Sequence, residues 1–172
     1  MDVGVAFVVH PELRFSPSKR PAEQMLAEAG LLASAIGLKI GHAEIISLST
    51  VRAASFFGKG VTTRLGELAS GCDGAVVIVN SALSPVQQRN LEMAIGAKVI
   101  DRTQLILEIF GARAQTHAGR LQVELAALSF QRSRLVRSWT HLERQRGGGG
   151  FLGGPGERQI ELDRRMLMRR VA

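Results

Sequence analysis

Two short apolar runs constrain the fold of this chain more than any other feature of its sequence. Residues 3–9 (VGVAFVV) and residues 75–79 (AVVIV) contain no polar side chain. A strand with such a sequence is buried on both faces, which is typical of a parallel sheet covered by helices on each side. The sequence therefore predicts an α/β fold with both segments as strands.

Helical patterns alternate with the predicted strands. Pro21 can occupy the first position of a helix, and apolar residues then recur at helical spacing as far as Gly37. Residues 39–48 read as a second strand, and residues 61–68 as a second helix. Each strand is thus followed by a helix, which favours right-handed parallel connections.

A capping pattern marks the next helix. Ser84 fits the N-cap, Pro85 the first turn and Gln87 the reciprocal position of a capping box. We expect this helix to end at Gly96, followed by a short strand over residues 98–100 and another helix from residues 101–103. Residues 1–112 are therefore predicted to form an N-terminal α/β domain, with a small parallel sheet of four or five strands and flanking helices.

The pattern changes near Gly111. Apolar residues then recur with spacings of four and three, interrupted by Arg132, which predicts a helix over residues 113–146, roughly 50 Å long. The positions of this heptad seam are Ala114, Ala118, Leu121, Leu125, Leu128, Arg132, Leu135, Trp139 and Leu142. A glycine-rich tip at residues 147–156 follows, and helical spacing returns over residues 157–171. We expect a long antiparallel helical hairpin.

The second helix of this hairpin is too short to cover the first. We therefore expect the hairpin to be truncated and the chain to be cut from a longer protein. An exposed heptad seam left without a partner would also allow self-association.

Charge is distributed very unevenly. Residues 1–112 carry ten Lys or Arg and ten Asp or Glu, whereas residues 113–172 carry twelve Arg and five acids. The whole net charge of +7 therefore lies in residues 113–172, which we predict to be a basic helical arm. Because arginine binds phosphates through a planar fork and stacks on bases, the arm favours contact with RNA over mere solubility.

Several other functions are disfavoured. No apolar run is long enough for a membrane span, and the first residues do not resemble a secretory signal. The single cysteine, Cys72, fits a reducing cytoplasm. The four histidines, His10, His42, His117 and His141, have no metal-ligand spacing, so we expect surface or capping roles for them and no metal site.

Neither glycine-rich segment fits a phosphate-binding loop. Lys59, between two glycines, lacks both the upstream glycine and the following Ser or Thr of a Walker motif, and the segment 147–156 has no lysine. Asn80 and Asp101 follow predicted strands, where parallel sheets bind ligands. Without a recognisable motif around them, turn capping is the favoured role for both. We predict no catalytic residue.

Several longer strings resemble one known family. Residues 83–92 (LSPVQQRNLE), 99–103 (VIDRT), 121–126 (LQVELA), 141–148 (HLERQRGG) and 154–165 (GPGERQIELDRR) are similar to signatures of HflX-type GTPases, as is the turn at residues 58–60 (GKG). The resemblance is in register from about residue 56 to residue 165. Arg158 departs from it, because the family usually has Thr at this position.

The resemblance implies a function for the parent protein. HflX-type proteins have an N-terminal α/β domain, a two-helix arm and a GTPase domain that holds GTP and Mg²⁺. They are cytoplasmic, associate with the large ribosomal subunit and help to split or rescue ribosomes. By this resemblance the chain is the N-terminal ribosome-binding region without the GTPase domain, which would be its partner within the parent protein. We expect this chain not to be catalytic and to hold no cofactor.

Charge and resemblance together give candidate contacts with rRNA. The arginines would bind phosphates, the glycines would allow close backbone approach, and the apolar pair at the tip would insert or stack. These residues are Arg144, Arg146, Gly147, Gly148, Gly149, Gly150, Phe151, Leu152, Gly153, Gly154, Arg158, Arg164 and Arg165.

Two alternatives remain open. Some members of the family are reported to bind ATP through the N-terminal domain. A nucleotide site at the carboxyl ends of the strands would use His10, Lys59, Asn80 and Asp101. The other alternative is a structural spacer that presents the GTPase domain and does not bind ribosomes.

Overall fold

The computed structural model describes the backbone of residues 4–145 and the side chains of residues 4–134. The chain divides into two compact units, Met1–Arg113 and Ala114–Ala172. Within the described residues, no helix combines the length and the hydropathy that crossing a membrane requires.

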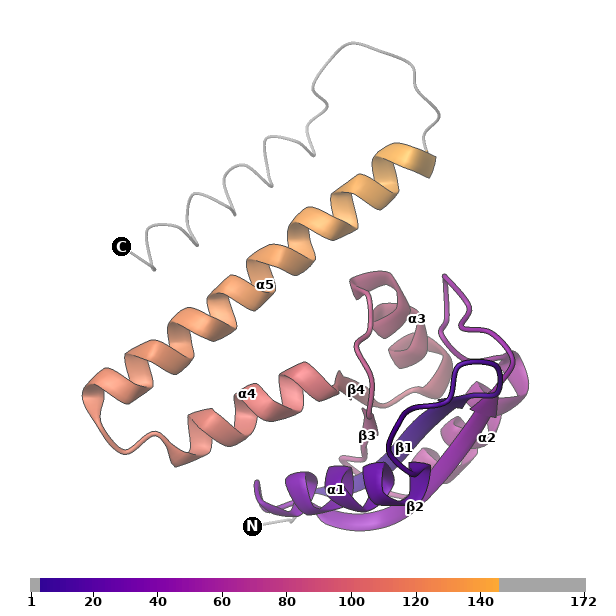
Figure 1. The fold of residues 1–172 in the computed structure, drawn as a ribbon, viewed down its shortest axis with the longest axis horizontal. Helices are drawn as coiled ribbons and strands as arrows, with labels where there is room; N and C mark the ends of the chain where they lie inside the picture. The colour runs from indigo at the N-terminus through magenta and orange to yellow at the C-terminus, as the bar shows by residue number, and fades with distance from the viewer. Residues whose placement is uncertain (1–3, 146–172) are drawn as a thin grey trace. The chain divides into compact units, whose positions relative to one another are not determined.

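The first unit is an α/β sandwich (Figure 1). Four parallel strands lie in the order β2-β1-β3-β4. This confirms the predicted parallel sheet with flanking helices and settles its size at four strands. The elements of this unit are β1 (Val5–Leu13), α1 (Ala22–Ser34), β2 (Lys39–Leu48), α2 (Lys59–Ser70), β3 (Val76–Val79), α3 (Pro85–Ile95), β4 (Lys98–Asp101) and α4 (Arg102–Arg113).

Strand β1 extends beyond its predicted end at residue 9. Its pairing with β2 runs from Val5 opposite Lys39 to Leu13 opposite Leu48, whereas β3 pairs only with Ala6–Val9. The apolar run ends at Val9, so the sequence predicts no strand beyond this residue. Pairing with the long strand β2 keeps the following polar residues extended.

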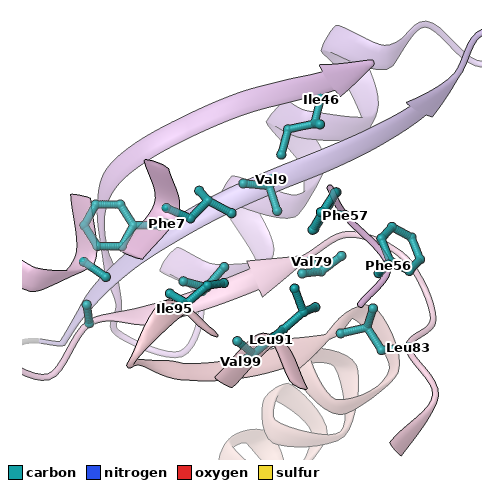
Figure 2. Packing of buried hydrophobic residues seen from close by; sticks show 14 of the residues in the cluster. Phe7, Val9, Ile46, Phe56, Phe57, Val79, Leu83, Leu91, Ile95 and Val99 are labelled. Atoms are coloured by element: carbon teal, nitrogen blue, oxygen red, sulfur yellow. The ribbon is translucent and has the colours of Figure 1, made fainter. Parts of the chain in front are cut away.

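Apolar clusters cover both faces of the sheet. On one face, Val9 and Val79 pack with Leu65 of α2 and Leu91 of α3, and Figure 2 shows the strand residues of this cluster converging with Leu91 and Phe57. On the other face, Val8 and Ile78 pack with side chains of α1 and α4. Helices on both faces explain why the central strands are apolar throughout.

Local signals place α3 where the sequence predicts it. The Ser84 hydroxyl accepts from Gln87 N at 3.1 Å, and Gln87 Oε1 accepts from Ser84 N at 2.9 Å. The helix ends at Gly96, whose φ of 75° lies in the left-handed region that glycine adopts without strain. The capping box is thus confirmed.

The second unit begins differently from the prediction. The expected helix over residues 113–146 is wrong at its start, since α4 ends at Arg113 and α5 begins at His117 (His117–Gln145). Thr116 causes the new start, because its hydroxyl accepts from Gly119 N at 3.0 Å and caps α5. The seam position Ala114 therefore lies outside α5. The tip and the second helix of the predicted antiparallel hairpin lie outside the described residues.

Candidate functional site

The carboxyl edge of the sheet contains a buried polar cluster. Strands β1 and β3 are neighbours, yet α1 leads from β1 to one side of the sheet and α3 leads from β3 to the other. Such a reversal of direction is where open α/β sheets bind ligands. His10 of β1 and Asn80, the residue after β3, lie there, and each is only 5% exposed.

Asn80 is the centre of this cluster. Its Nδ2 donates to the carbonyl of Met25 in α1 at 3.1 Å and lies 3.1 Å from His10 Nδ1. Its Oδ1 accepts from Arg102 Nη1 at 2.8 Å. The side chain therefore joins β1, β3, α1 and α4, and the turn-capping role predicted for it is wrong.

These contacts determine the protonation of His10. Because Asn80 Oδ1 faces Arg102, Nδ2 must face His10, and His10 Nδ1 must accept the hydrogen bond as the neutral tautomer. Burial, and to a smaller degree the Arg102 charge, lower the pKa of His10, although the Glu12 charge and a hydrogen bond with the Asn80 backbone oppose the shift. The predicted surface or capping role for His10 is wrong, since the imidazole is buried inside a hydrogen-bond network.

Arg102 connects the cluster to a partly exposed ion-pair chain. Its Nη2 lies 2.5 Å from Glu28 Oε1, and Arg20 Nη2 lies 2.7 Å from Glu28 Oε2. Hydrogen bonds from Arg102 and then Arg20 lower the pKa of the Glu28 carboxyl. One carboxylate therefore binds two arginines from segments far apart in the sequence.

Asp101 and Lys59, the other two candidates for a nucleotide site, have different surroundings from His10 and Asn80. Asp101 is 1% exposed, and its carboxylate accepts from Gln104 N at 2.8 Å and Leu83 N at 3.2 Å. The predicted capping role is thereby confirmed. Lys59 begins α2 with an exposed side chain. Within residues 4–134, the structure brings His10 and Asn80 together and records no contact of Lys59 with either.

Two other histidines have described side chains, His42 and His117, whereas the side chain of His141 lies outside the described residues. His42 is partly buried, packs near the ring of Phe7 and places Nε2 3.3 Å from Glu44 Oε1, at ion-pair distance but outside hydrogen-bond geometry. His117 is exposed at the start of α5. No group of three metal-ligating side chains occurs among the described residues.

The polar side chains of α3, which belong to the family-like string of residues 83–92, make contacts within the protein. Gln87 Nε2 donates to Arg52 O at 2.9 Å, and Asn90 Nδ2 donates to Ala54 O at 2.8 Å. These two side chains hold a tight loop, residues 52–56, in which Phe56 has a φ of 60°. This string thus fixes a strained loop against α3.

The same helix is also tied to β4. Gln88 Nε2 donates to Val99 O at 2.6 Å, and Glu92 Oε1 accepts from Val99 N at 3.1 Å. The polar string between residues 84 and 92 therefore uses its hydrogen bonds to position α3.

Sequence reasoning missed Arg102 and Glu28. Arg102 lies two residues after the strand predicted over residues 98–100, so its place near the carboxyl edge was available from the sequence. Its pairing with Glu28 was not, because the two residues lie 74 positions apart and the sequence does not specify the relative position of α1 and α4.

Most predicted rRNA contacts lie outside the described residues. Arg144 belongs to α5, whose backbone is described to Gln145, but its side chain is not described. Arg146 and all the candidates from residue 147 to residue 165 lie outside the description entirely. Their contacts with RNA remain predictions from the sequence.

Two family models match the chain. The model described as GTP-binding GTPase N-terminal matches residues 23–111, and the model described as GTP-binding GTPase Middle Region matches residues 113–172.

Curated relatives agree with these models. The chain is 52% identical over 149 residues to GTPase HflX of Magnetococcus marinus, a match that covers 87% of this chain and 34% of that protein. It is 54% identical over 116 residues to GTPase HflX of Escherichia coli K12, covering 67% of this chain and 27% of that protein. The chain thus spans about a third of the length of the curated relatives it matches.

Solved structures show the same fold. A GTP-binding protein from the hyperthermophilic archaeon Sulfolobus solfataricus in complex with GDP aligns with a TM-score of 0.61, over 97% of this chain and 44% of that chain. At 16% identity, this likeness supports the fold alone.

Proposed function

The chain belongs to the HflX family of GTPases, and on that premise we propose that it is the region of an HflX protein that binds the large ribosomal subunit. Residues 113–172 supply the contacts with rRNA, and binding helps to split or rescue ribosomes in the cytoplasm. The first unit, which is neutral over residues 1–112, is a scaffold in this proposal.

One observation carries the proposal. Residues 113–172 hold twelve arginines against five acids, whereas residues 1–112 are neutral. A surface that neutralises phosphates needs such a local excess of cations, and the resemblance to HflX-type proteins makes ribosomal RNA the expected partner. Helix α5, with 29 residues, is about 44 Å long, which suits an arm that reaches into a crevice.

GTP hydrolysis belongs to the parent protein in this proposal. The sequence has no Walker motif, and the described residues offer no cluster of metal ligands. GTP and Mg²⁺ would therefore bind in a separate GTPase domain, which would be a partner of this region.

Co-sedimentation with purified large subunits tests the proposal. We expect the chain to pellet with the subunits and the combined Arg144→Ala, Arg146→Ala and Phe151→Ala variant to remain largely in the supernatant. The matched control is Arg89→Ala with Lys98→Ala, which also removes two charges but from exposed positions of the first unit. Equal pelleting of both variants and the unaltered chain would exclude this role for the arm.

A second candidate is nucleotide binding at the carboxyl edge. The observation in its favour is that His10 and Asn80 lie together where the strand connections reverse direction. Against it, both side chains already bind protein groups. Calorimetry with millimolar ATP or GTP would test it, and the absence of binding heat would remove it.

Self-association through the seam is a further proposal. Leu121 and Leu125 of α5 are 53% and 44% exposed. Sedimentation equilibrium over a concentration series would test it, and a single monomer mass at every concentration would contradict it.

A further inference from the structure

The turn after β1 contains the most exposed large apolar side chain of the described residues. Phe15 is 85% exposed. It lies in the loop 14–20 (RFSPSKR), which contains three cations and no acid. An isolated exposed ring between cations has no role in the core of this unit.

The backbone holds Phe15 in a defined position. Ser16 N donates to Leu13 O at 3.3 Å and closes a turn with Arg14 and Phe15 at its centre. Arg14 N donates to Leu48 O at 2.9 Å, which fixes the turn to the end of β2.

The rest of the loop is also restrained. Ser18 Oγ accepts from Arg20 N at 3.3 Å, and Pro17 and Pro21 each have a fixed φ. Ordering a loop costs affinity when a ligand binds, so a loop that is already ordered binds at a smaller cost.

Two of the three cations are available to a ligand. Arg20 is paired with Glu28 at 2.7 Å. Arg14 Nε donates to the hydroxyl of Ser47 at 3.1 Å. Within the described part of the chain, neither Arg14 nor Lys19 has a carboxylate at ion-pair distance.

We propose that this turn is a second RNA-binding site, in which the Phe15 ring stacks on an unpaired base and Arg14 and Lys19 bind the flanking phosphates. Aromatic rings stack on any base, and cations beside them neutralise the strand. Unpaired RNA is the expected ligand because the bases of a duplex are not open to stacking. The choice of RNA as the partner rests on the proposed function. The site itself lies in the first unit, whereas the proposed function places the rRNA contacts in residues 113–172.

RNA fits this turn better than a membrane surface does. Phe15 is the only large apolar residue of the loop 14–20, and its neighbours include Ser16 and Ser18. Membrane insertion scales with buried apolar area and needs more than one such side chain.

Fluorescence anisotropy with a short unpaired oligoribonucleotide tests the proposal on the full chain. We expect Phe15→Ala to weaken binding by about tenfold, the range expected for one base stacked on an aromatic ring. Phe15→Leu keeps the apolar bulk without the aromatic face, so stacking predicts a similar loss. Phe110→Ala removes a ring that is 59% exposed on α4 and should leave the affinity unchanged.

The arm variant separates this site from the proposed function. In the background of Arg144→Ala, Arg146→Ala and Phe151→Ala, Phe15→Ala should still weaken binding by the same factor, because substitutions in sites that share no partner have additive effects. Unchanged affinity of Phe15→Ala in both backgrounds would overturn the second site and leave the arm proposal standing. Full affinity of Phe15→Leu, or Phe15-dependent binding only to phosphatidylglycerol vesicles, would also overturn it.

Discussion

Arg102 Nη1 donates a 2.8 Å hydrogen bond to Asn80 Oδ1, across 22 positions of sequence. This contact joins the start of α4 to the end of β3 and orients the Asn80 amide so that its nitrogen faces His10. The polar cluster at the carboxyl edge is therefore a structural joint between two strands and two helices. The polar atoms of this cluster form hydrogen bonds mainly with one another, so removing one side chain deprives each of its partners of a hydrogen bond.

Replacing Asn80 by alanine should destabilise the first unit by about 2–3 kcal/mol, because buried or partly buried partners on three elements each lose a hydrogen bond. Urea unfolding followed by circular dichroism measures this loss. Asn90→Ala is the matched control, since it removes one contact, with Ala54 O, from a less buried position. Equal losses of unfolding free energy in the two variants would contradict the claim that Asn80 joins these elements.

The stability should depend on pH through His10. The folded state holds His10 neutral with a lowered pKa, whereas in the unfolded chain the histidine has a pKa of about 6.5. Below that value the unfolded chain binds a proton that the folded chain excludes. The contribution is therefore complete above about pH 6.5 and is lost as pH falls towards the lowered pKa. Glu28, whose pKa is also lowered, acts only in more acidic solution.

Unfolding free energies measured between about pH 8 and about pH 5 test this dependence. We expect His10→Gln to reduce the slope and His117→Gln, a change at an exposed position, to preserve it. A full slope in His10→Gln would show that other groups cause the dependence.

Two glycines of α2 should respond oppositely to alanine. A Cβ at Gly66 would lie 3.2 Å from the carbonyl of Ile95 in α3, whereas a Cβ at Gly60 meets open space. Alanine favours a helix over glycine by about 1 kcal/mol, a gain that only Gly60→Ala keeps. Thermal unfolding should therefore rank Gly60→Ala above the unaltered chain and Gly66→Ala below it. A melting temperature for Gly66→Ala at or above that of Gly60→Ala would contradict the close approach of the two helices.

Asp101→Ala should cost about 2–3 kcal/mol, because two backbone donors lose a buried carboxylate. Asp101→Asn keeps one side-chain oxygen as an acceptor and should cost less. Urea midpoints of the two variants measure the difference. If the asparagine variant were as unstable as the alanine variant, the capping contact would not be the source of the stability.

Much of the fold could be predicted from the sequence because the local patterns of strands, helices and caps agree with the way these elements pack. The apolar runs predict the buried strands, and Ser84 with Gln87 predicts the start of α3. The break before α5 was missed, since the seam spacing continues through Ala114 and conceals the cap at Thr116.

The candidate site was less predictable. Asn80 and Asp101 could be placed at strand ends, but their partners depend on the packing of helices. The sequence places His10 at the surface, because nothing near this histidine in the sequence reveals that the Asn80 amide will hydrogen-bond to it in the fold. Phe15 between basic residues was visible in the sequence, but its exposure required the structure.

The salt dependence of binding to the large ribosomal subunit tests the central claim most directly. The dissociation constant of the unaltered chain and of Arg144→Ala with Arg146→Ala would be measured from about 50 to about 200 mM salt. The account predicts steep weakening with salt for the unaltered chain. In the double variant the magnitude of the log–log slope should fall by about 1.8, since each phosphate contact contributes about 0.9. An unchanged slope, or no binding at the lowest salt, would contradict the claim that this arm binds rRNA.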